Sequence, residues 1–162
     1  MIGVAGLGKS GISAANLLLK NGEEVILFDS NKELDKNTIL DKFDKKYHER
    51  IKIVLRDLNE SDAKDMKYCV ISPGIDLEVD FVKTLKSCNI PIWSEVELGY
   101  KYSKGDLIAI TGTNGKTTTT TLVTKILQTA GKKAISVGNI GRTITDELSS
   151  RTSDEWFVAE LS

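Results

Sequence analysis

The chain has 162 residues and a formal net charge of −1, with 40% hydrophobic and 28% charged residues. This composition is typical of a globular protein, and the length allows one domain or two small ones. The nearly neutral charge gives no support for nucleic-acid binding, and no apolar run approaches the roughly 20 residues that span a membrane. Because the N-terminus lacks a basic segment followed by a small-residue cleavage site, we expect a cytoplasmic protein.

The N-terminal segment predicts a βαβ unit of about thirty residues. The apolar run Ile2–Ala5 predicts a buried strand, and Ile12–Lys20 carries apolar residues at helical spacing. Asn21-Gly22 predicts the end of that helix, and Glu24–Phe28 predicts the second strand. A strand, a helix and a second strand of these lengths are typical of a parallel sheet.

The turn after the first strand carries a glycine pattern. Gly6-x-Gly8-x-x-Gly11 fits the dinucleotide-binding fingerprint, and Asp29 follows the second strand, where that fingerprint has its acidic ribose ligand. Three interpretations are open at this point: binding of NAD or FAD, binding of a different pyrophosphate nucleotide, and a tight turn without a ligand.

Residues 31–93 continue the alternation of strands with polar or helical segments. The highly charged segment Asn31–Arg50 predicts a solvated helix or loop. Further strands are expected at 51–55, 68–71 and 90–93, and a helix at 79–88. Together with the first βαβ unit, these elements predict a Rossmann-like domain with a parallel sheet over residues 1–93.

Residues 94–162 predict the beginning of a second α/β domain, of the P-loop ATPase type. Its expected helices are at 94–102, 119–130 and 143–150, and its expected strands are at 107–110, 133–137 and 156–161. Because the chain ends at the carboxyl end of an apolar strand, we expect a truncated domain and a fragment of a larger enzyme. The alternative is a naturally short protein with a terminal strand.

A candidate phosphate loop, Thr111–Thr118, lies between a strand and a helix of this second domain. Backbone N–H groups and a helix N-terminus attract anions at such a junction. Gly115 allows close approach of the backbone, Lys116 can reach terminal phosphate oxygens, and the Thr117 hydroxyl can bind the magnesium that accompanies ATP.

The match to the general P-loop pattern is incomplete. That pattern has a glycine five residues before the Gly-Lys pair, where this chain has Ile110. The earlier glycine is Gly112, so the loop is a tighter variant. The alternative is a simple turn between strand and helix with an exposed lysine.

The Gly-Thr-Asn-Gly-Lys-Thr-Thr sequence at residues 112–118 resembles the ATP loop of Mur ligases and folylpolyglutamate synthases. The resemblance implies an acyl-phosphate mechanism, in which ATP phosphorylates a carboxylate and an amine then displaces phosphate. Segments 6–15, 72–75 and 138–141, and the beginning of another at 160–162, extend the resemblance to Mur ligases over nearly the whole chain. In that family the first domain holds a UDP-linked sugar, so the glycine turn would bind UDP.

The order and spacing of these segments are most similar to the Mur ligases that add D-glutamate to UDP-N-acetylmuramoyl-L-alanine. Alanine-adding ligases usually have a histidine where this loop has Asn114, and the diaminopimelate- or lysine-adding type lacks this glycine fingerprint. Both remain alternatives, together with an NAD(P)-binding oxidoreductase domain and a non-catalytic nucleotide-binding module.

The resemblance also implies a role for individual residues. The ATP-binding residues would be Gly112, Thr113, Asn114, Gly115, Lys116, Thr117 and Thr118. Lys116, Thr117 and Glu160 would act in catalysis, with Thr117 and Glu160 around Mg²⁺. The substrate-binding residues would be Gly8, Lys9 and Ser10 at the UDP pyrophosphate, Asp29 and Ser30 at the uracil, Ser72 and Gly74 in the substrate channel, and Asn139 at the muramoyl end.

The family has further parts that this chain would lack: more magnesium ligands, a carbamylated lysine, the rest of the ATPase domain and a C-terminal D-glutamate-binding domain. We therefore expect no ligase activity from these residues alone. The resemblance implies a monomeric enzyme of peptidoglycan synthesis, and thus of cell-wall growth and division, with no nucleic-acid or membrane partner.

Overall fold

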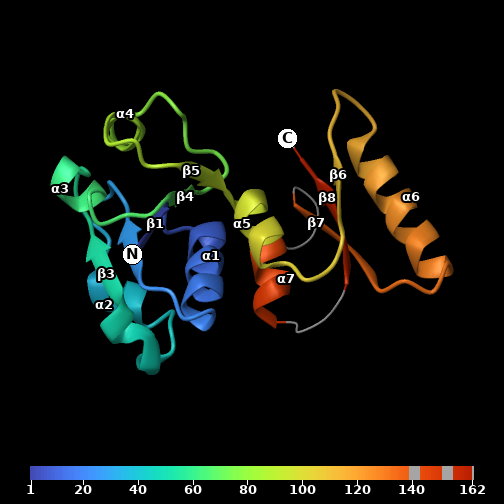
Figure 1. Ribbon diagram of the computed structural model, residues 1–162, viewed down its shortest axis with the longest axis horizontal. Coiled ribbons are helices and arrows are strands. Elements are labelled where there is room, and N and C mark those ends of the chain that lie inside the picture. Colours follow the sequence, from blue (N-terminus) through green and yellow to red (C-terminus); the bar gives the residue numbers. More distant parts are fainter. Residues whose placement is uncertain (139–142, 151–154, 162) are drawn as a thin grey trace. The chain divides into compact units, whose positions relative to one another are not determined.

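The computed structural model describes residues 1–138, 143–150 and 155–161. The chain divides into two compact units, Met1–Glu95 and Val96–Ser162, whereas the sequence analysis draws the boundary after residue 93. Each unit contains a parallel sheet with helices, which confirms the predicted α/β class (Figure 1). Among the described residues, none of the helices combines the length and apolar character needed to cross a bilayer.

Five parallel strands form the sheet of the first unit, in the order β3-β2-β1-β4-β5. Their bounds are Ile2–Ala5 for β1, Val25–Phe28 for β2, Ile51–Val54 for β3, Cys69–Ile71 for β4 and Ile92–Ser94 for β5. Ala5 aligns with Phe28 and Ile71, and Phe28 aligns with Val54. The segments that follow β1 to β4 therefore all leave the sheet at the carboxyl ends of its strands, a side of the sheet that we call its carboxyl edge.

Helix α1 (Lys9–Lys20) packs against β1, β2 and β4 through buried apolar residues that include Leu17, Leu18 and Leu19. It begins three residues earlier than the apolar spacing predicts, because Gly8 is the N-cap and the first turn is polar or small. Gly22, with φ of 87°, ends the helix, and the Glu23 N–H donates to the Leu18 carbonyl. This ending confirms the predicted Asn-Gly stop.

The remaining helices of the first unit are short. They are α2 (Lys36–Leu40), the 3₁₀ helix η1 (Lys45–Arg50), α3 (Glu60–Ala63) and α4 (Asp80–Ser87). Helices α3 and α4 contribute Ala63 and Leu85 to a buried apolar cluster with Phe28 of β2. The Phe28 and Phe81 rings lie 4.9 Å apart between centroids, which joins α4 to β2.

The apolar pattern of the sequence predicts no helix at α3. The helix forms because Asn59 and Asp62 make a capping box: the Asn59 side chain accepts the Asp62 N–H at 3.0 Å, and the Asp62 carboxylate accepts the Asn59 N–H at 3.4 Å. A cap residue followed three positions later by an acidic residue is a recognisable helix start. The four-residue length of α3 leaves no apolar periodicity to accompany that signal.

The second unit has a three-stranded parallel sheet in its described part, in the order β6-β8-β7. The strands are β6 (Leu107–Ile110), β7 (Ala134–Gly138) and β8 (Trp156–Glu160). Helix α6 (Lys116–Thr129) covers one face, while α5 (Glu95–Tyr102) and α7 (Ile144–Ser150) lie on the other (Figure 1). Glu160 aligns with both Ile110 and Gly138, so the loop after β6 and the end of β8 share an edge.

Substitution of Gly11 tests how closely α1 approaches the turn after β1. A Cβ atom at position 11 would overlap the backbone carbonyl oxygen of Gly6, whereas a Cβ at Gly8 meets no atom within 4 Å. We expect Gly11→Ala to lower the free energy of unfolding by about 1–3 kcal/mol, as overpacking does. Gly8→Ser is the control, because serine is also a favoured N-cap residue, and its expected change is within about 0.5 kcal/mol. Chemical denaturation measures both, and equal stabilities would contradict the close approach.

Candidate functional site

A cavity of about 760 Å³ opens in the first unit, at the carboxyl ends of its strands. Segments after β1, β2, β3 and β4 line it, together with α4. The lining residues are Gly6, Phe28, Asp29, Ser30, Asp57, Leu58, Gly74, Ile75, Asp76, Val79, Asp80, Phe81 and Thr84. Ligands of open parallel sheets bind at this edge, and a mixed apolar and polar lining suits an organic ligand with polar groups.

The glycine turn after β1 is held by side chains from the two neighbouring strands. Asp29, which follows β2, accepts the Leu7 N–H at 3.0 Å through Oδ2. The Ser72 hydroxyl, which follows β4, donates to the Gly6 carbonyl at 3.1 Å. Gly6 itself has φ of 85°, a left-handed conformation that favours glycine. These contacts fix the path of the backbone between the strand and α1.

The start of α1 is suited to an anion. Its N-cap, Gly8, provides no side-chain cap, and the first turn contains no acidic residue. The first N–H groups of a helix have no partner within the helix, and the helix dipole places positive potential there. Phosphate oxygens at this position can accept hydrogen bonds from these N–H groups, and their negative charge is favoured by the positive potential.

The structure distributes the predicted substrate-binding residues over three locations. Asp29, Ser30 and Gly74 line the cavity. Gly8, Lys9 and Ser10 form the start of α1 and are not part of the lining, while the Ser72 hydroxyl is occupied by the Gly6 carbonyl. Asn139 lies outside the described residues. The ligand contacts of all these residues stay predictions.

The sequence patterns did not single out the lining residues Phe28, Asp57, Leu58 and Asp76, or the contributions from α4 and its N-cap Val79. Asp57 and Leu58 directly follow β3, so their place after a predicted parallel strand is the signal that could have identified them. No comparable signal exists for the α4 residues Phe81 and Thr84, because their approach to the cavity depends on how α4 packs on β2.

The second candidate site is the loop between β6 and α6. Gly115 is the N-cap of α6, with φ of 75°, and a Cβ there would meet no atom within 4 Å. No side chain caps this helix and no acidic residue occupies its first turn. The Lys116 ammonium donates to the Gly112 carbonyl at 2.8 Å, so the lysine closes the loop on itself. Thr117 and Thr118 are exposed.

Glu160 supplies a buried carboxylate at the same edge as this loop. The residue is 6% exposed, and among the described residues no hydrogen-bond donor reaches its Oε2 atom. A buried carboxylate without a donor is costly, and a bound cation would remove that cost. The described residues contain no group of three or more His, Cys, Asp or Glu side chains arranged for a metal. The Thr117 hydroxyl and the Glu160 carboxylate are oxygen ligands of the kind that magnesium takes.

Two family models match the chain. Residues 1–94 match the Mur ligase MurD-like N-terminal domain, and residues 110–161 match the Mur ligase middle domain. The chain is 46% identical over 159 residues to a UDP-N-acetylmuramoylalanine–D-glutamate ligase of Lachnoclostridium phytofermentans and 36% identical over 161 residues to that of Bacillus subtilis. Each alignment covers 98% of this chain and 35% of the relative, so the chain spans about a third of the length of these curated relatives.

Solved structures of similar fold agree with these matches. A pseudomurein peptide ligase type C from Methanothermus fervidus is 25% identical, with a TM-score of 0.54 over 98% of this chain and 32% of that one. A murein peptide ligase from Psychrobacter arcticus is 22% identical, with a TM-score of 0.53 over 99% of this chain and 37% of that one, which supports the fold.

Substitution of Lys116 tests the loop before α6 as an ATP site. We expect Lys116→Ala to weaken Mg-ATP binding by at least about tenfold, because an ammonium group that can pair with terminal phosphate oxygens is lost. Lys125→Ala is the matched control, since Lys125 is an exposed lysine further along α6. Isothermal titration calorimetry with Mg-ATP compares the two variants, and equal affinities would contradict a phosphate site at this loop.

Proposed function

This chain belongs to the Mur ligase family, and from that premise we propose that it is part of an enzyme that adds D-glutamate to UDP-N-acetylmuramoyl-L-alanine. The proposal makes residues 1–95 the carrier of the UDP-linked substrate and the following unit the beginning of the ATP-binding domain. The observation that carries it is the cavity at the carboxyl edge of the first sheet, beside a fixed glycine turn, in a segment that matches the MurD-like N-terminal domain.

The substrate side of the proposal uses the first unit. The pyrophosphate lies against the uncapped start of α1, with N–H groups of Gly8, Lys9 and Ser10 as donors. The uracil end lies in the cavity near Asp29 and Ser30. Asp29 already accepts the Leu7 N–H through Oδ2 and the Asn31 N–H at 2.9 Å through Oδ1, so the second lone pair of each oxygen is what remains for the base or ribose.

The ATP side uses the loop before α6. Lys116 leaves the Gly112 carbonyl and pairs with phosphate oxygens, and the N–H groups of Gly115 to Thr118 hold the same anion. Thr117 and Glu160 hold magnesium, which gives the buried Glu160 carboxylate a partner. When bound, Mg-ATP supplies the phosphoryl group that activates the substrate carboxylate toward the amine of D-glutamate.

The proposal also concerns what lies beyond these residues. The named relatives are about three times as long as the matched region, since 159 aligned residues cover 35% of the ligase of Lachnoclostridium phytofermentans. We propose that D-glutamate binding and the remaining metal ligands belong to the additional length, and that this chain alone does not ligate D-glutamate. The complete enzyme is proposed to be a cytoplasmic monomer of peptidoglycan synthesis, and thus to serve cell shape and cell division.

An NAD(P)-binding oxidoreductase domain is the competing function for the glycine turn. The turn and Asp29 alone fit both nucleotides, because both present a pyrophosphate and a ribose. The MurD-like match over residues 1–94 and the Lys116 loop favour the UDP-linked substrate.

Titration calorimetry separates the two functions. We expect UDP-N-acetylmuramoyl-L-alanine and UDP to bind the chain, because both present the pyrophosphate and uracil that the first unit is proposed to hold. NAD is expected to bind at least about tenfold more weakly, since neither of its bases is uracil. Binding of NAD without binding of UDP would overturn the proposal and favour an oxidoreductase domain.

A further inference from the structure

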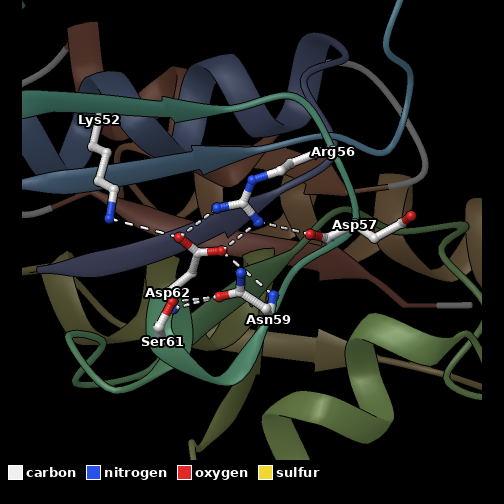
Figure 2. Close-up of polar contacts among 6 residues, drawn as sticks. All are labelled: Lys52, Arg56, Asp57, Asn59, Ser61 and Asp62. Carbon is white, nitrogen blue, oxygen red and sulfur yellow. Dashed lines mark hydrogen bonds and ion pairs between the residues drawn. The ribbon is translucent and has the colours of Figure 1, made fainter.

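The ion pair between Arg56 and Asp62 has no role in the function proposed above. The Asp62 side chain is 4% exposed and receives both arms of the guanidinium, with Nη1 2.7 Å from Oδ2 and Nη2 3.1 Å from Oδ1. The Lys52 ammonium lies 3.7 Å from Oδ1. Figure 2 shows the side chains of Lys52 and Arg56 directed toward the Asp62 carboxylate, Lys52 from the left of the view and Arg56 from the right.

The same residues hold the backbone that follows β3. The Arg56 Nη1 atom also donates to the Asp57 carbonyl at 2.9 Å, and Asp62 accepts the Asn59 N–H at 3.4 Å. Residues 56–62 therefore form a closed loop in which one guanidinium contacts both the beginning of the loop and the helix after it. The Asp57 side chain points away from this cluster (Figure 2); it is 90% exposed, and its Oδ2 atom lies 4.0 Å from the Lys32 ammonium.

The attraction between the charged Asp62 side chain and its partners Arg56 and Lys52 stabilises this conformation of the loop. Burial opposes the charged form of Asp62, but the hydrogen bonds from Arg56 and the Asn59 N–H and the charges of Arg56 and Lys52 outweigh it. They hold the pKa of Asp62 below its ordinary value of 3.8. Asp62 is thus charged at neutral pH, and separating it from Arg56 would leave a buried charge without its main partner.

The loop is also the outer wall of the cavity. Asp57 and Leu58 line the cavity, and Leu58 is 7% exposed within the apolar cluster that includes Phe28. Strand β3 neighbours β2, with Val54 beside Phe28, so this wall stands next to Asp29 and Ser30. The first turn of such a fold takes the pyrophosphate, and the acidic residue after the second strand takes the ribose. A wall one strand further out therefore meets the nucleoside end of the ligand.

We infer that Arg56 and Asp62 are positioning residues, whose ion pair holds the Asp57–Leu58 wall in place for the nucleobase. The inference rests on the proposed function, in which a UDP-linked substrate fills the cavity. The ion pair then raises the affinity for the nucleotide by holding the wall in place, without contact between Arg56 and the ligand. Because the pyrophosphate lies at α1, the ion pair affects ligands that carry a base and leaves inorganic pyrophosphate unaffected.

Calorimetry with UDP, UMP and inorganic pyrophosphate tests the inference on the 162-residue chain. We expect Arg56→Met to weaken binding of UDP and UMP by about tenfold, because binding must then order a wall that is no longer held. Binding of pyrophosphate is expected to change by less than about twofold. The control is Lys67→Met, which removes an ion pair with Glu23 (3.4 Å) remote from the cavity lining and should leave all three affinities unchanged.

Two further variants separate positioning from charge and from folding. Arg56→Lys keeps the charge but lacks the planar fork, so we expect its UDP affinity to stay nearer to that of Arg56→Met than to that of the parent. Asp62→Asn keeps the side-chain shape and weakens the same pair from the other side, which gives a second measurement if circular dichroism finds Arg56→Met unfolded. We expect it to weaken UDP and UMP binding and to spare pyrophosphate.

The outcomes distinguish this inference from the function on which it rests. If the parent chain binds no UDP, the proposed function and the inference both fail. If the parent binds UDP and folded Arg56→Met or Asp62→Asn retains the parent affinity, the positioning role alone is overturned. An equal loss for pyrophosphate, or full recovery with Arg56→Lys, would also overturn it, because a general loss of stability or of charge would then explain the effect.

Discussion

The close approach of α1 to the turn after β1 is the constraint on which the first unit depends. Gly11 lies so near the Gly6 carbonyl that a side chain at that position would overlap it. Glycine there lets the helix begin directly behind the turn, with its N-terminus at the carboxyl edge of the sheet. Asp29 and Ser72 then fix the turn from either side. The position of the helix start thus depends on one backbone contact, and Gly6 of the same turn also lines the cavity.

The second unit repeats this sequence of strand, glycine turn and helix, but its candidate site contains charged side chains. A strand again leads through a glycine at positive φ into an uncapped helix, α6. Here the charged groups are prominent: Lys116 closes the loop, and Glu160 is buried with one oxygen that no described residue satisfies. The first site offers backbone donors and a cavity, which suits a large substrate, whereas the second offers a cation and a carboxylate, which suits phosphate with magnesium.

Apolar periodicity and the rule of parallel strands account for what the sequence could predict. The runs Ile2–Ala5 and Leu107–Ile110 form strands with the predicted bounds, because strands of parallel sheets are continuous apolar segments. All four residues of β1 are buried, whereas those of β6 are partly buried or exposed. Asp29 was expected at a ligand from the glycine fingerprint, and Gly74 from the family resemblance. Both line the cavity because the loops after parallel strands meet at the carboxyl ends of those strands. The D-glutamate-adding type, in contrast, was suggested by resemblance and not by any physical pattern.

The features that the sequence did not predict depend on contacts between residues that form no periodic pattern. Helix α3 is four residues long and is held by a cap and by Arg56, so hydrophobic spacing carries no trace of it. The α4 contribution to the cavity depends on the packing of Phe81 on Phe28, which joins residues more than fifty positions apart. The unsatisfied oxygen of Glu160 is a property of the folded sheet and its burial, since the sequence by itself only places a glutamate near the end of a strand.

The central claim is that the turn after β1 and the cavity beside it hold the diphosphate and base of one nucleotide. Amide chemical-shift mapping of the isotope-labelled chain during titration with UDP tests it residue by residue. We expect shifts concentrated at Leu7 to Ser10, at Asp29 and Ser30, and at Leu58, all at the carboxyl edge of the first sheet. Shifts confined to residues 112–118, or scattered without relation to that edge, would contradict it.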